Sequence, residues 1–112
     1  MPITLSQVYT LSAGSTRLVH IDCTRDLDSG AKLTGTPTIA EVTTTALTLA
    51  NKKVNTTTYV DSVRGSTVAI GKALEFTATG GVAGTTYTIR ATCGTDSTPA
   101  ETLVYDLQLT YA

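Results

Sequence analysis

The chain has 112 residues, a length typical of one domain that can bury an apolar core without disulfides or a metal. Its formal net charge is −1 and its eight Lys and Arg residues are scattered, so the sequence offers no basic surface for nucleic acid or a membrane. No apolar run approaches the roughly 20 residues that span a bilayer, and residues 1–4 lack the pattern of a signal peptide. We therefore expect proteins as partners.

Threonine occupies 25 positions and tryptophan none, a composition that favours strands because a branched side chain packs well on a pleated sheet. Alternation of apolar and polar residues locates these strands, since successive side chains point to opposite faces. In chain order they are predicted at residues 8–11, 18–23, 32–42, 47–49, 68–70, 74–79, 86–93 and 103–111. The last strand shows the pattern best, with one face formed by Leu103, Tyr105, Leu107, Leu109 and Tyr111.

Several segments are predicted to break or connect these strands. Pro37 has no amide hydrogen, so the strand over 32–42 is expected to bend or to lie at an edge. Residues 51–66 are polar and rich in threonine, which indicates an extended hairpin or loop. The glycines at 80, 81 and 84 precede a strand instead of a helix, so they indicate a turn and not a phosphate-binding loop.

The number and spacing of these strands predict the fold class. Seven or eight short antiparallel strands, with turns every ten or so residues, are typical of an immunoglobulin-like β-sandwich or a small barrel. We take the sandwich as the prediction. It forms a single domain over residues 1–112, in which residues 1–7 can extend as an N-terminal arm.

Residues with catalytic or metal-binding chemistry are few. His20 shares its predicted strand face with Leu18 and Asp22, and a general base needs a partner and a pocket that this strand does not supply. Asp22, Asp26 and Asp28 could offer oxygen ligands to calcium, but the spacing of a calcium loop is missing. The sequence therefore predicts a protein that is not an enzyme and holds no metal or cofactor.

The two cysteines close the second and the next-to-last predicted strands. In an immunoglobulin-like sandwich Cys23 and Cys93 can face each other across the core, so a disulfide is one prediction. Two buried thiols that pack as small apolar groups are the other. Without a signal peptide, the free thiols are favoured.

Two stretches resemble a known family. Residues 16–22 read TRLVHID and lead into LDSGAKL at 27–33, and residues 79–89 read TGGVAGTTYTI. In this order and separation they resemble the small immunoglobulin-like structural proteins of tailed bacteriophages, the fibre-tail adaptor family. The chain departs from that family's pattern at residues 23–25 and in the length of residues 51–61.

The resemblance implies a protein that assembles into a virion in the host cytoplasm. It would be present in several copies and would join tail or neck subunits to fibres. A head decoration protein is an alternative, and so is a carbohydrate-binding module that uses Tyr9 and Tyr59. We expect partner contacts in the N-terminal arm, the acidic turn and the excursion over 51–63, at Ile3, Leu5, Asp26, Asp28, Asn55 and Tyr59.

Overall fold

The structure is a computed structural model that describes residues 6–27, 30–42, 47–60 and 65–112. These residues form nine strands and one short 3-10 helix. The strands are β1 (Ser6–Leu11), β2 (Thr16–Asp22), β3 (Leu33–Glu41), β4 (Thr48–Val54), β5 (Tyr59–Val60), β6 (Thr67–Val68), β7 (Ala73–Thr79), β8 (Thr86–Thr95) and β9 (Thr102–Tyr111), and the helix is η1 (Thr24–Asp26).

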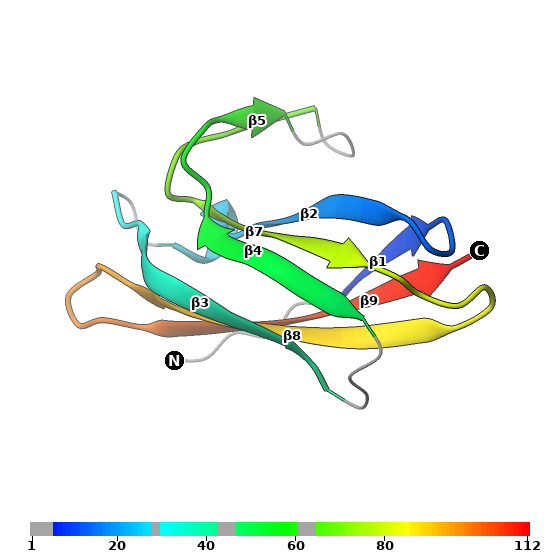
Figure 1. Cartoon of the computed structure of the whole chain (residues 1–112). Helices are drawn as coiled ribbons and strands as arrows, with labels where there is room; N and C mark the ends of the chain where they lie inside the picture. Colours follow the sequence, from blue (N-terminus) through cyan, green and yellow to red (C-terminus); the bar gives the residue numbers. More distant parts are fainter. Residues whose placement is uncertain (1–5, 28–29, 43–46, 61–64) are drawn as a thin grey trace.

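Seven of the strands form two sheets that stack face to face (Figure 1). One sheet has the order β1-β9-β8-β3 and the other the order β2-β7-β4, while β5 and β6 pair as a separate hairpin between β4 and β7. Setting β1 aside, the two orders are those of an immunoglobulin-like sandwich, in which strands B, E and D face strands C, F and G. The predicted all-β sandwich is confirmed, and the two sheets do not close into a barrel.

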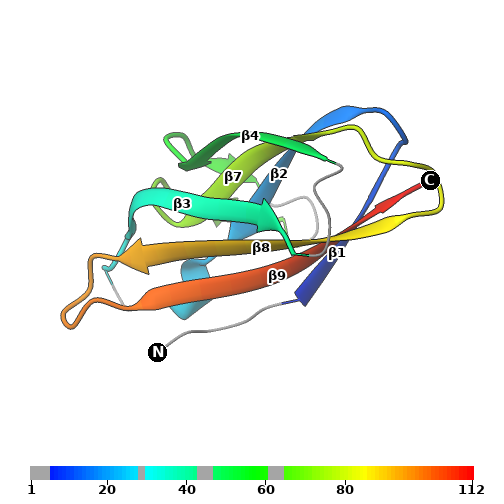
Figure 2. The same cartoon turned by 60° about the horizontal axis from the view of Figure 1, so that its bottom comes forward.

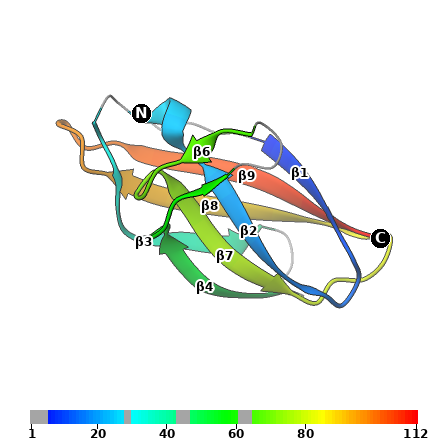
Figure 3. The same cartoon turned by 90° about the horizontal axis from the view of Figure 1, so that it is seen from above.

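Strand β1 belongs to the sheet of the last strand and runs parallel to it. Ser6 lies opposite Asp106 and Leu11 opposite Tyr111. The turn over residues 12–15 then carries the chain across to the other sheet, which lies in front of β8 and β9 in Figure 3. This one pair departs from the antiparallel arrangement that we expected. Alternation identifies which face of a strand is apolar, but it carries no information about the direction of the neighbouring strand.

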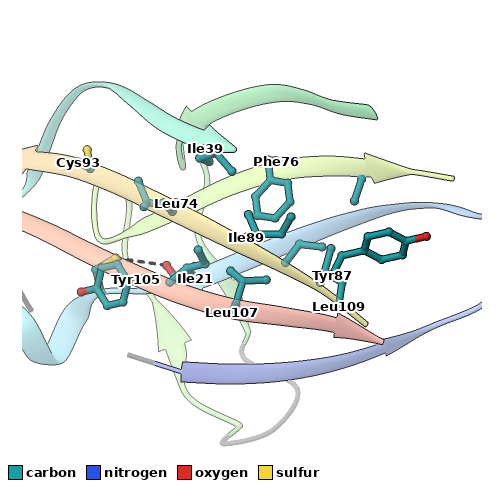
Figure 4. Close-up of a cluster of buried hydrophobic side chains, with 14 of the residues drawn as sticks. Ile21, Ile39, Leu74, Phe76, Tyr87, Ile89, Cys93, Tyr105, Leu107 and Leu109 are labelled. Atoms are coloured by element: carbon teal, nitrogen blue, oxygen red, sulfur yellow. Dashed lines mark hydrogen bonds between the residues drawn. The ribbon is translucent and has the colours of Figure 1, made fainter. Parts of the chain in front are cut away.

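The core lies between the sheets and uses the side chains that alternation predicts. Figure 4 shows the inward side chains of β7, β8 and β9 meeting those of β2 and β3. Leu103, Leu107 and Leu109 are 1 % exposed or less. The side chains that are most fully buried are Tyr105, Tyr111, Phe76, Ile21, Ile39, Leu74, Ile89, Leu103, Leu107, Leu109, Val68 and Cys23.

The middle of the chain differs most from the prediction. Strand β4 does not end near residue 49 but continues to Val54, with a register shift between Ala50 and Lys53 where Asn51 has a φ of 55°. The excursion after it contains the β5–β6 hairpin, in agreement with the hairpin alternative. Strand β3 shifts register between Thr34 and Thr38, around Pro37, as an edge strand with a proline should.

Cys23 and Cys93 are both free thiols and both buried. Cys23 precedes η1 and directs its Sγ to the carbonyl oxygen of Ile21 at 3.5 Å, while the Cys93 Sγ lies 3.5 Å from the carbonyl oxygen of Thr34. Burial raises the pKa of both thiols, that of Cys23 to about 12. Each thiol therefore acts as a small apolar group, the alternative that the sequence favoured.

Native thiols are expected to resist modification. A rise in the pKa of Cys23 from 9.0 to about 12 lowers its thiolate fraction at pH 8 about 1,000-fold, and the thiolate is the reactive form. Titration with an aromatic disulfide reagent at pH 8 should therefore label the folded protein very slowly and both thiols at once in denaturant. Rapid labelling of the folded protein, with circular dichroism unchanged, would contradict the buried thiols.

Candidate partner-binding surfaces

The outer face of the three-stranded sheet carries a row of ionisable side chains, one from each strand. The strand register places His20 of β2 and Lys53 of β4 on either side of Glu75 in β7. His20 Nε2 lies 2.9 Å from Glu75 Oε2, and Lys53 Nζ lies 3.4 Å from Glu75 Oε1. Because the Glu75 side chain is only 10 % exposed, these two neighbours offset much of the cost of burying its charge.

The β5–β6 hairpin packs on the His20 end of this polar row. Tyr59 of β5 stacks on the His20 ring, with the ring centroids 3.9 Å apart and the planes at 19°. Val68 of β6 is 1 % exposed, so the hairpin packs its apolar side against the molecule. A histidine bonded to a carboxylate could act as a base, but here Nε2 already contacts Glu75 and one ring face meets Tyr59. The arrangement fastens the hairpin to the sheet.

Asn55 holds the base of the same excursion. Its Oδ1 accepts hydrogen bonds from the amides of Gly71 and Ala73, both at 3.0 Å. Its Nδ2 donates to the carbonyl oxygens of Thr57 and Ala69 at 2.9 and 3.0 Å. The polar surroundings of Asn55 in sequence led us to expect an exposed contact residue. Instead the residue is 2 % exposed, and its side chain bonds four backbone groups that have to be paired when they are buried. Asn55 therefore holds the excursion together.

Of the other predicted contact residues, the structure describes Asp26. Asp26 lies in η1, where its Oδ2 accepts a hydrogen bond from the Tyr105 hydroxyl at 2.7 Å. Burial and the neighbouring Cys23 and Asp26 raise the pKa of Tyr105, which therefore keeps its proton and anchors the helix. Ile3, Leu5 and Asp28 lie outside the described residues. Tyr59 and Asn55 share one excursion, and η1 with Asp26 follows the end of β2 that pairs with Ala73, the residue whose amide Asn55 bonds.

Asp22 is used locally. Its Oδ1 accepts hydrogen bonds from the amide and the hydroxyl of Thr24, at 3.0 and 2.6 Å, which fixes the start of η1. Across the described part of the chain, no three His, Cys, Asp or Glu side chains gather in a group that could hold a metal ion. Within the same residues, no helix is long and apolar enough to cross a membrane.

The outer face of the four-stranded sheet has the opposite character. Figure 2 shows β8 and β9 with no strand in front of them. The outward residues of β3, β8 and β9 are small and mostly threonine, namely Thr38, Ala40, Thr86, Thr88, Thr92, Thr102, Val104, Gln108 and Thr110. Among the described side chains of these three strands, only Arg90 and Asp106 bring charge to this face.

Arg90 and Asp106 form a two-pronged ion pair in the middle of that face. Arg90 Nε donates to Asp106 Oδ1 at 2.7 Å, and Nη2 donates to Oδ2 at 3.0 Å. The hydrogen bonds from Arg90 lower the pKa of Asp106, and those to Asp106 raise the pKa of Arg90, so both groups stay charged at neutral pH. Alternation placed both residues outward, but their pairing depends on the β8–β9 register, which the sequence pattern does not state.

No family model matches the chain, and no curated protein matches it.

Proposed function

We propose that the chain is a non-enzymatic structural protein of a tailed bacteriophage virion, an adaptor between tail or neck subunits and fibres. It acts by binding other virion proteins, in several copies per particle, and it assembles with them in the host cytoplasm. The open outer face of the four-stranded sheet is the observation that best supports a binding role. It is uncharged apart from one internally paired Arg and Asp, and it is built on strands instead of loops. Little charge has to be desolvated when such a face is covered.

The positions of the two family-like stretches support the choice of partner. The glycine turn at residues 80–84 leads into β8, the next-to-last strand. Gly81 has a φ of 96°, and its α-carbon lies against the ring of Tyr111 in the last strand. The first stretch supplies β2, and its second part leads into β3. Both stretches therefore shape the ends of strands in one sandwich.

The two ends of the sandwich differ, which suits a protein that joins two kinds of neighbour. At one end, Gly14 donates to the carbonyl oxygen of Gly81 and Gly84 donates to that of Tyr111. The turns gathered there are small and uncharged, and Val82 is 65 % exposed. At the other end, the amide of Lys32 donates to the Asp96 carboxylate and the amide of Asp96 to the Lys32 carbonyl. Charged residues therefore mark that end.

Deletion of the gene from a phage that carries it tests this proposal. We expect particles that lack their fibres, with fibre attachment restored by the chain supplied from a plasmid, because an adaptor is needed only at the junction. Electron microscopy of the particles provides the readout. In a parallel experiment the purified chain should join a complex with products of neighbouring virion genes in light scattering. Normal, infectious particles without the chain would overturn the proposal, as would a chain that binds glycans and no virion protein.

A further inference from the structure

We propose that the open outer face of the four-stranded sheet is a self-association surface, through which two copies of this chain pack face to face about a two-fold axis. The occupant of the face is thus a second copy. This inference concerns the isolated chain and holds whether or not the chain belongs to a phage particle.

The two outer faces of the sandwich differ in a way that selects this one. On the three-stranded sheet, Tyr59 of the hairpin packs on the His20 ring beside the buried Glu75, while the Lys53 side chain stays 54 % exposed. On the four-stranded sheet, no strand of the described residues lies in front of β8 and β9 (Figure 2), and most of their outward side chains are small. Two sheets that pack face to face lie about 10 Å apart, a separation that short outward side chains from both copies can fill.

A two-fold axis that runs between β8 and β9, along the strands, makes the face complementary to itself. The rotation places β8 of one copy over β9 of the other at the same height. Each residue of β8 then faces the residue that is already its cross-strand neighbour within one chain. By the β8–β9 register, Thr92 faces the second copy's Val104, and Thr88 faces the second copy's Gln108. Such an interface is closed, because the same patch serves both copies.

The charges of Arg90 and Asp106 fit the same two-fold rotation. Arg90 and Asp106 are cross-strand neighbours, so the rotation sets each arginine opposite the second copy's aspartate. Two of the five guanidinium N–H groups are used within the chain, by Nε and Nη2, and the Arg90 side chain is 54 % exposed. The remaining N–H groups can donate to the second carboxylate. Four charges then alternate in sign at the centre of the interface, with no net charge to bury.

The two-pronged geometry also lowers the entropy that association would lose. Arg90 is held by two hydrogen bonds at 2.7 and 3.0 Å, so its long side chain is ordered before the second copy arrives. The pKa directions of the pair keep Asp106 ionised and Arg90 protonated at neutral pH. Salt should weaken the association, because it screens partly exposed charges.

Charge reversal and exchange test the surface. Sedimentation equilibrium of the wild-type chain should give a mass approaching twice 11.7 kDa as the concentration rises toward about 1 mM, the weak end of specific binding. Arg90→Asp would gather four carboxylates at the axis and Asp106→Arg four guanidinium groups. Each should raise the dissociation constant at least about tenfold, because like charges repel in a desolvated interface. The exchange Arg90→Asp with Asp106→Arg restores alternating charges and should restore dimerisation.

A second variant keeps the test independent of the ion pair. Thr92→Arg places a long cation opposite Val104 of the second copy and should also give a monomer. Leu18→Arg is the matched control, because Leu18 is 55 % exposed on the outer face of the other sheet, and its mass should stay that of two chains. Circular dichroism checks that each variant is folded.

Three results would overturn the inference. A wild-type chain that remains a monomer up to about 1 mM excludes self-association of this strength. A dimer that is equally stable in Arg90→Asp, Thr92→Arg and wild type uses another surface. A monomer that binds a neighbouring virion protein, and loses that binding in Thr92→Arg, would make the face a docking site for a different protein. The last result would support the proposed function while rejecting this inference.

Discussion

Gly81→Ala is expected to destabilise the domain by about 3 kcal/mol, from overpacking together with positive-φ strain. A β-carbon at this position would lie 2.4 Å from Cδ2 of Tyr111. The ring has little room to retreat, because it is 1 % exposed and packs edge to face on Tyr87 with centroids 5.5 Å apart. Position 81 also has a φ of 96°, which an alanine rarely adopts. Urea unfolding should show a lower midpoint with an unchanged slope.

Gly84→Ala is the matched control in the same turn. Gly84 has a φ of 81°, but no atom lies within 4 Å of the place where its β-carbon would be. Only the conformational strain remains, so we expect a loss of about 1 kcal/mol. Equal losses at the two positions would mean that the contact with Tyr111 does not set the cost at Gly81.

Sequence predicts best those strands that have one face in the apolar core and the other in water. In β9, polar residues alternate with Leu103, Leu107 and Leu109, and the structure buries these leucines against the core. In β7 the same pattern correctly points Glu75 outward, yet its side chain is only 10 % exposed. The hairpin that covers Glu75 comes from a polar, threonine-rich segment. The sequence of β7 itself contains no pattern that predicts this contact. Coverage by a distant segment is a property of the tertiary structure.

The candidate surfaces were harder to predict, because polar side chains look alike in sequence whether they face water or backbone. Asn55 was expected at the surface, although its amide satisfies four backbone groups inside the excursion. Tyr59 was expected to contact a partner, and the structure places it on His20, from a strand far away in sequence. The Arg90 and Asp106 pair follows from the β8–β9 register alone, so a hairpin prediction with a fixed register would have found it.

Asn55→Ala is expected to cost about 3 kcal/mol, because it leaves buried backbone groups without partners at about 1–3 kcal/mol for each one that water does not reach. The amide of Ala73 would lose its side-chain acceptor, that of Gly71 would keep only the carbonyl oxygen of residue 55 at 3.2 Å, and the carbonyls of Thr57 and Ala69 would lose a donor. The excursion should therefore loosen before the sandwich unfolds. Hydrogen exchange should rise first at the amides of residues 71 and 73, and the imidazole resonances of the covered His20 should shift. Thr56→Ala, at an exposed position of the same excursion, is the control, and it should leave these signals unchanged.

Asn55→Asp separates the acceptor role of this side chain from its donor role. The carboxylate keeps an oxygen for the two amides but sets a negative charge against the carbonyl oxygens of Thr57 and Ala69. Burial and these carbonyls should raise the pKa of the new carboxyl in the folded state above its unfolded value of about 3.9. A carboxyl whose pKa is higher in the folded than in the unfolded state destabilises the folded protein most when it is ionised in both states. The free energy of unfolding that the variant has lost against wild type should therefore shrink as the pH falls from 7 toward about 4. Urea midpoints across that range provide the measurement. A deficit that is constant with pH would place the side chain in water, and the hairpin would then need another anchor.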